Sequence, residues 1–75
     1  MFDEIKKLMV DNLGLEADEI QESTEFKKDL GIDSLDLFEL VSEVEEIYGV
    51  EIAAEDLEGI VSVKNLVDYI EKKKN

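Results

Sequence analysis

The chain has 75 residues, of which 44% are hydrophobic, and its 21 acidic residues against 8 lysines give a net charge of −13. This length predicts a single domain over residues 1–75 with a small core, which argues against a deep enzyme cleft, while the apolar content argues against disorder. Nucleic acids and anionic membranes would be repelled by the charge, and the absence of histidine and cysteine removes the commonest general base, metal ligand and thiolate.

The first segment of the chain predicts an amphipathic helix over residues 2–13. Its apolar side chains recur at the 3.6-residue period and share one face, which holds Phe2, Ile5, Met9 and Leu13, with Leu8 at the flank. Gly14 follows as a residue that can end the helix in a left-handed conformation. We expect this face to lie in the core and assign it no chemistry.

A long connection is predicted over residues 15–33. Acidic residues dominate it and are interrupted by single apolar anchors at Leu15, Ile20, Phe26, Leu30 and Ile32, with one short turn at residues 17–20. Connections of this length are uncommon in compact domains and are often functional. We expect the loop to lie over the helices, with Lys27 and Lys28 in a solvated turn.

The second helix is predicted over residues 34–48 and is ended by Gly49. Its buried face holds Leu37, Leu40, Val41, Val44, Ile47 and Tyr48. The opposite face is acidic, with Asp36, Glu39, Glu43 and Glu46, and with Glu45 at its border. Leu35 projects from this acidic side, with Ser42 beside it and Phe38 at the boundary between the two faces.

The last part of the chain predicts a short helix and a longer one. Val50 and Ile52 are extended anchors, residues 55–60 form the short helix, and Ser62 caps a helix with Val63, Leu66, Val67 and Ile70 on one face. Lys72, Lys73 and Lys74 suit the negative end of that helix. The predicted fold is all-α, a small four-helix bundle of three longer helices and one short helix, with a long loop between helices 1 and 2.

The loop meets the second helix at Ser34. Asp33 is a typical N-cap residue, and Asp36 is placed three positions later, as in a capping box. Gly31 gives the backbone freedom for a tight approach to this cap. Ser34 then occupies the first helical position, with its hydroxyl outside the core. By itself, this pattern is also typical of an ordinary helix start.

Several chemistries are excluded around Ser34. No histidine is available to take its proton, and Lys27 and Lys28 lie on a polar loop, so we expect no catalytic residue and no enzyme. Acids on an open helix face are solvated, whereas general acid–base work needs a cleft that shields them from water. A calcium loop beginning at Asp33 fails because Phe38 lies where glycine is needed, so no metal site is assigned.

The sequence around Ser34, together with the rest of the chain, resembles the acyl carrier proteins of bacterial fatty-acid synthesis. The residues that carry the resemblance are Leu30 to Asp36, Glu39, Leu40, Val41, Glu45, Glu46, Tyr48, Gly49 and Val50 to Ile52. The resemblance covers essentially the whole chain. It implies an acyl-carrier domain in which a phosphopantetheinyl transferase attaches 4′-phosphopantetheine covalently to Ser34. The terminal thiol of that group then carries acyl groups as thioesters.

The resemblance also implies two sets of binding residues. An acyl chain would fold back against Leu37, Val41, Val44 and Ile60, and synthase enzymes with basic patches would dock on Asp33, Leu35, Asp36, Glu39, Glu45 and Glu46. No membrane-spanning run or signal-peptide pattern is present, so we expect a cytoplasmic monomer.

Some residues depart from the family pattern and keep alternatives open. Leu37 is bulkier than the small polar residue common there, Ser42 replaces a frequently apolar residue, Ala53 stands where proline is common, and Lys27 and Lys28 interrupt an acidic run. One alternative is a specialised carrier for polyketide, aminoacyl or D-alanyl groups. Another is an acidic interaction or divalent-ion-binding domain in which Ser34 is only a cap.

Overall fold

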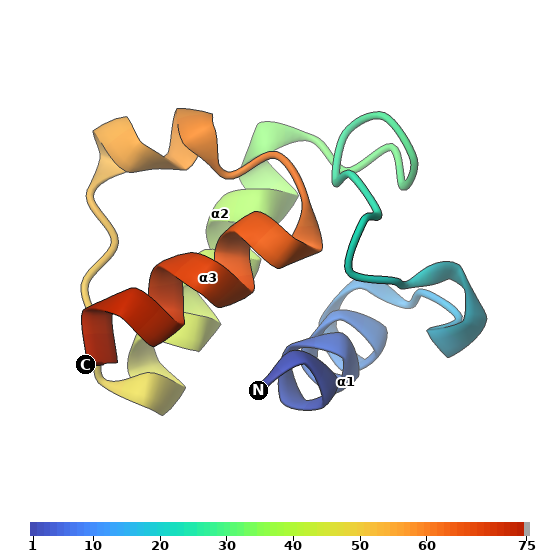
Figure 1. Cartoon of the computed structure of the whole chain (residues 1–75). Helices are drawn as coiled ribbons and strands as arrows, with labels where there is room; N and C mark the ends of the chain where they lie inside the picture. The colour runs from blue at the N-terminus through green and yellow to red at the C-terminus, as the bar shows by residue number, and fades with distance from the viewer. Residues whose placement is uncertain (75) are drawn as a thin grey trace.

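The computed structural model describes residues 1–74 and consists of three α-helices and two short 3-10 helices. In chain order these are α1 (Phe2–Leu13), η1 (Ala17–Glu19), α2 (Ser34–Tyr48), η2 (Ala54–Gly59) and α3 (Val63–Lys74) (Figure 1). Helix α1 packs against both α2 and α3. The predicted helical bundle is confirmed, and the short helix expected at residues 55–60 is η2. No helix within residues 1–74 has the length and apolar character needed to cross a membrane.

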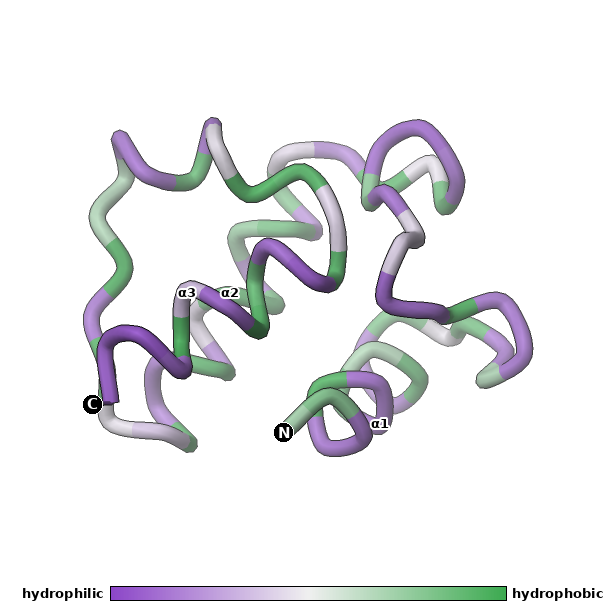
Figure 2. Tube along the Cα trace, in the orientation of Figure 1, coloured by the Kyte–Doolittle hydropathy of each residue, from purple (hydrophilic) through white to green (hydrophobic). Residues whose placement is uncertain are grey.

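The core is built from the apolar faces that the helical periodicity predicts. Its buried members on the three α-helices are Ile5 and Met9 of α1, Leu37, Leu40, Val41 and Val44 of α2, and Val63, Leu66, Val67 and Ile70 of α3. Each helix contributes side chains spaced three or four residues apart, so three apolar stripes meet in one cluster. Figure 2 shows the complementary pattern, with hydrophilic residues along the loop and at the end of α3.

Ile47 corrects the predicted buried face of α2. Its side chain is 53% exposed, although Val44, one turn earlier, is fully buried. Ile47 lies at the edge of the apolar stripe and in the last turn of the helix, where Gly49 takes the left-handed conformation (φ 67°) that ends it. A residue at the stripe edge is covered only where a neighbouring element extends over it, which periodicity cannot show.

The loop between α1 and α2 is fastened to the beginning of α3. The Val63 N–H donates to the Thr24 carbonyl oxygen at 2.9 Å, and the Lys64 N–H donates to the Glu22 carbonyl oxygen at 2.9 Å. Ile20, Phe26 and Ile32 are buried as expected. The loop is therefore a fixed part of the fold, with its polar residues in solvent and its anchors in the core.

Phe26 is the central anchor of this loop. Its side chain is only 1% exposed. Its N–H donates to the Val61 carbonyl oxygen at 3.0 Å, and its own carbonyl oxygen accepts the Ile32 N–H at 2.9 Å. One residue thereby joins the loop to the segment before α3 and to the segment before α2.

We predict that Phe26→Ala removes most of the cooperative unfolding transition. Truncating a buried phenylalanine costs about 3–5 kcal/mol, which is comparable to the whole stability of a domain of this size. Leu35→Ala is the control, because an exposed side chain outside the core changes stability by about 0.5 kcal/mol or less. Chemical denaturation followed by circular dichroism measures both, and equal losses in the two variants would contradict the assigned role of Phe26.

Candidate functional site

Ser34 is exposed at the first position of α2, and Asp33 fixes the start of the helix. Asp33 has an extended backbone, and its Oδ1 accepts the Asp36 N–H at 2.9 Å. Its carbonyl oxygen accepts the Leu37 N–H at 3.0 Å. The predicted N-cap is thus confirmed, with Asp36 taking part through its backbone while its side chain faces solvent.

Gly31 sets the direction in which the chain approaches this cap. Its φ of 64° lies in the left-handed region, which side chains with a Cβ adopt at a cost. The next residue, Ile32, is buried, whereas Asp33 and Ser34 are exposed. The turn at Gly31 therefore allows an apolar anchor and an exposed hydroxyl to lie only two residues apart.

Ser34 lines a small pocket at this end of the bundle. The pocket has a volume of about 150 Å³, and its other walls are Lys27, Leu37, Phe38, Leu57 and Glu58. A second pocket of about 160 Å³ adjoins it, because Lys27, Leu37, Leu57 and Glu58 line both. The second pocket continues to Phe26 and Ile60. The two adjoining pockets form a path from Ser34 to the buried Phe26 and Ile60. The elements that line this path are α2, the loop and η2, whose arrangement can be followed in Figure 1.

The four predicted acyl-pocket residues are placed differently from one another. Leu37 lines both pockets, and Ile60 lines the deeper one. Val41 and Val44 are buried on the same face of α2 but line neither of these two pockets. The role of all four toward an acyl chain stays a prediction.

Sequence reasoning missed four residues of the Ser34 pocket. Phe38 was placed at a helix boundary but is 55% exposed beside Ser34. Leu57 and Glu58 lie on η2, whose direction relative to α2 leaves no local pattern in the sequence. Lys27 could have been found, since the Lys27–Lys28 pair is the only basic pair between α1 and α3, but it was assigned to a solvated turn.

A side-chain hydrogen bond holds η2 against α3. The Tyr69 Oη donates to Asp56 Oδ2 at 2.6 Å. The pKa of Tyr69 is raised above its usual value, mainly by this hydrogen bond, because only the protonated phenol can donate it. Since η2 carries Leu57 and Glu58, the bond supports one wall of the Ser34 pocket.

The predicted partner-recognition residues lie along the outer side of α2. Asp33, Leu35, Asp36, Glu39 and Glu46 are exposed, and Leu35 is 69% exposed. Glu45 differs, because it is half-buried and its Oε2 accepts the Ile52 N–H at 2.7 Å. Glu45 therefore also fixes the segment that follows α2. The part of these residues in partner recognition stays a prediction.

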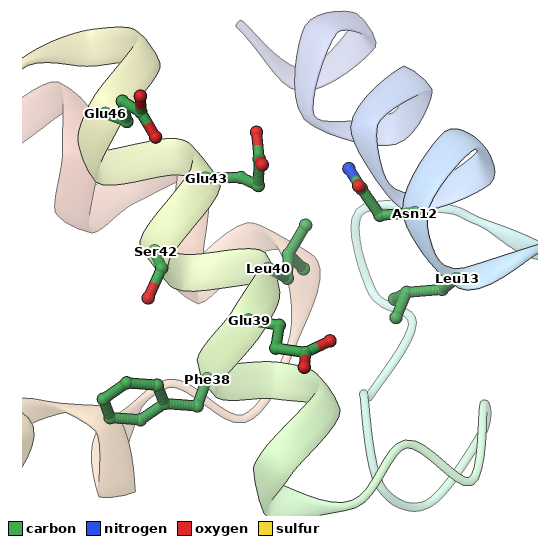
Figure 3. Close-up of a pocket in the computed structure, with 8 residues that line it drawn as sticks. All are labelled: Asn12, Leu13, Phe38, Glu39, Leu40, Ser42, Glu43 and Glu46. Carbon is green, nitrogen blue, oxygen red and sulfur yellow. The ribbon is translucent and has the colours of Figure 1, made fainter.

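A groove of about 340 Å³ separates this side of α2 from α1. Leu13 and Leu40 contribute apolar surface, and Glu39, Glu43 and Glu46 contribute carboxylates. Figure 3 shows Glu39 directed toward α1 and Phe38 pointing away from it, toward the other side of α2. Within the described chain, the ion pair present joins the N-terminal amine to Glu4 at 3.8 Å, so no lysine neutralises the carboxylates of α2. Residues 1–74 hold no metal-binding group of three or more acidic, histidine or cysteine residues.

Comparison with known proteins identifies the family. The family described as "Phosphopantetheine attachment site" matches residues 3–70. The acyl carrier protein of Nitratidesulfovibrio vulgaris strain DP4 is 44% identical over 71 residues, which cover 95% of this chain and 93% of that protein. The acyl carrier protein of Solidesulfovibrio magneticus is 46% identical over 72 residues, covering 96% of this chain and 92% of that protein.

Fold, site and family match together define a carrier domain for a phosphopantetheine group. The chain belongs to the acyl carrier protein family. The predicted resemblance is thereby confirmed. The family also confirms two further predictions: the protein is a carrier and not an enzyme, and its cofactor is a covalently attached 4′-phosphopantetheine.

We predict that Tyr69→Phe loosens η2. Loss of the hydrogen bond to Asp56 should increase hydrogen exchange at the η2 amides and at the Ile60 N–H after η2, which donates to the Leu57 carbonyl oxygen. The control is Tyr48→Phe, since the Tyr48 hydroxyl makes no hydrogen bond to η2. Amide exchange followed by NMR measures the effect, and unchanged η2 protection in Tyr69→Phe would contradict the support assigned to this bond.

The same bond gives a pH dependence with a definite sign. The pKa of Tyr69 is raised in the folded chain above the ordinary value of 10.0. Its stabilising contribution is therefore complete below the unfolded pKa and is lost as pH rises through the folded one. The protection of the η2 amides, measured relative to the intrinsic exchange rate at each pH, should fall more steeply in that alkaline range in the natural chain than in Tyr69→Phe.

Proposed function

We propose that residues 1–75 form one acyl-carrier domain in which Ser34 bears the 4′-phosphopantetheine arm, and that the chain carries acyl intermediates of fatty acid biosynthesis. The observation that supports this most directly is the exposed Ser34 hydroxyl at the start of α2, opening onto an apolar pocket. The family match indicates which group is attached, and the pocket would give the acyl cargo a place to lie. When bound, the group provides a thiol on which acyl groups form thioesters.

The position of Ser34 suits the root of a long flexible arm. A transferase must reach the hydroxyl, and Ser34 is exposed at a helix end. The phosphate of the arm would lie by the positive N-terminal end of α2. The chain itself contains no cysteine, so its working thiol has to come from the attached group.

The adjoining pockets support a sheltered position for the acyl chain. A chain that folds back from the Ser34 arm would pass between Leu37 and Leu57 and reach Ile60. Val41 and Val44 lie one and two turns beyond Leu37 on the same buried face, so longer chains would meet them next. Each buried methylene contributes about 0.8 kcal/mol, which favours a buried acyl chain over an exposed one.

The acidic side of α2 supports docking by basic partners. We propose that a phosphopantetheinyl transferase and acyl-processing synthases contact the predicted surface, which consists of Asp33, Leu35, Asp36, Glu39, Glu45 and Glu46. Exposed ion pairs contribute about 0–1 kcal/mol each and are screened by salt, so a cytoplasmic monomer could be released quickly from each enzyme. Leu35 would supply an apolar contact within the charged surface.

Modification of Ser34 gives the first test of this function. We expect wild-type protein incubated with transferase and coenzyme A to gain one phosphopantetheine, and Ser34→Ala to gain none. Ser42→Ala is the matched control, because Ser42 is also exposed on α2. Intact-mass analysis measures the uptake, and the same measurement on protein from its native cell distinguishes a fatty acyl cargo from a polyketide, aminoacyl or D-alanyl one. A modified Ser34→Ala would refute the assignment.

Recognition through Leu35 gives the second test. We expect Leu35→Lys to keep its helical content but to be modified about tenfold more slowly, because a buried leucine contributes about 1.5–3 kcal/mol and 1.4 kcal/mol corresponds to tenfold. Ile47→Lys places the same charge at another exposed apolar residue of α2 and should retain the wild-type rate. Transferase kinetics and circular dichroism measure the two properties, and equal rates in both variants would remove Leu35 from the docking surface.

A further inference from the structure

Lys27 is a lysine on a rigid part of the loop. Its neighbour Phe26 is buried, and both backbone polar groups of Phe26 are hydrogen-bonded, to Val61 and to Ile32. The next turn is also closed, because the Asp29 N–H donates to the Glu25 carbonyl oxygen at 3.0 Å. The backbone that carries Lys27 is therefore fixed, although its side chain is exposed.

The same hydrogen bonds bring Lys27 to the start of α2. The Ile32 N–H donates to the Phe26 carbonyl oxygen with an N···O distance of 2.9 Å, so Phe26, which precedes Lys27, lies beside Ile32, two residues before Ser34. Lys27 and Ser34 line one pocket of about 150 Å³. Lys28 lines the deeper pocket but not the one that contains Ser34. The two adjacent lysines therefore differ in their relation to Ser34.

The charges around Ser34 are otherwise negative. Asp33 and Asp36 flank it on the chain, and Glu58 of η2 lines the same pocket. The Asp36 N–H at the helix end already donates to the Asp33 carboxylate, so this N–H is not free to donate to another anion. Lys27 is the one cation lining that pocket, and within residues 1–74 it makes no ion pair.

We propose that Lys27 binds the phosphate of the arm and so acts as a positioning residue for its root. This inference rests on the proposed attachment of phosphopantetheine to Ser34. The phosphodiester adds a negative charge between Asp33, Asp36 and Glu58, and the Lys27 ammonium group offsets that repulsion from the opposite side of the pocket. The contact holds the root of the arm at the mouth of the path that leads between Leu37 and Leu57.

A thermodynamic cycle between the unmodified and modified forms tests this contact. The variants are Lys27→Gln, Lys28→Gln as the control with the same change in net charge, and Glu58→Gln with the opposite change. For each, the midpoint of thermal unfolding is measured at low salt before and after the arm is attached. An exposed ion pair of about 0.5 kcal/mol corresponds to about 2–4 °C in a domain of this size.

We expect attachment of the arm to lower the midpoint by about 2–4 °C more in Lys27→Gln than in wild type, and by the wild-type amount in Lys28→Gln. In Glu58→Gln, attachment of the arm should lower the midpoint less than in wild type, or raise it more. The Lys27 effect should vanish in 1 M salt, where the screening length is about 3 Å. The ³¹P resonance of the arm should move in Lys27→Gln and not in Lys28→Gln.

Each other outcome has a definite meaning. Equal changes in midpoint for the two lysine variants, together with an unmoved ³¹P resonance, would overturn the contact while leaving the carrier function intact. A Lys27→Gln protein that excess transferase cannot modify would overturn it too, by placing Lys27 in transferase recognition. Intact mass and peptide mapping are read first, and an arm that is absent from Ser34 in wild type would refute the proposed function itself and this inference with it.

Discussion

Burial of Phe26 is the constraint on which the arrangement of the site depends. Its ring lies in the core, its N–H is bonded to Val61 before α3, and its carbonyl oxygen is bonded to Ile32 before α2. These contacts join the loop to the start of α2 and to the segment before α3, which is far away in the sequence. Without them, the loop would have no fixed relation to the start of α2, and the pocket at Ser34 would lose its loop wall.

The strong negative charge is accommodated because nearly all of it stays in water. The buried polar residue is Thr24, while the carboxylates of α2 lie on its outer side, apart from the half-buried Glu45. Two carboxylates have structural tasks at the ends of α2: Asp33 caps its beginning, and Glu45 binds the Ile52 N–H after its end. Acidic residues thus serve the fold where backbone N–H groups need acceptors, and the exposed carboxylates of α2 form the surface proposed for docking.

The helices could be predicted from the sequence because their signals are local. Apolar residues at the 3.6-residue period and an Asp33 cap define α2 without any knowledge of its neighbours. Ile47 shows the limit, since its exposure depends on which element covers the end of the helix. Among the walls of the Ser34 pocket, Leu37 was predicted, but the placement of the loop and of η2 beside it could not be. That placement depends on hydrogen bonds between distant residues, such as Phe26 with Val61 and Tyr69 with Asp56, and these leave no periodic pattern.

The walls of the pocket differ in how firmly they are held, and this difference suits a carrier. On one side, Ser34 and Leu37 belong to a capped helix of 15 residues whose inner face is in the core. On the other, Leu57 and Glu58 belong to a six-residue 3-10 helix with no buried residue, and in the described chain its side-chain hydrogen bond is the one from Tyr69 to Asp56. Hydrogen bonds in 3-10 helices have poorer geometry than those in α-helices. With the arm on Ser34, as proposed, its root would lie on the firm side, and the wall facing an incoming acyl chain would be the one that is least costly to displace.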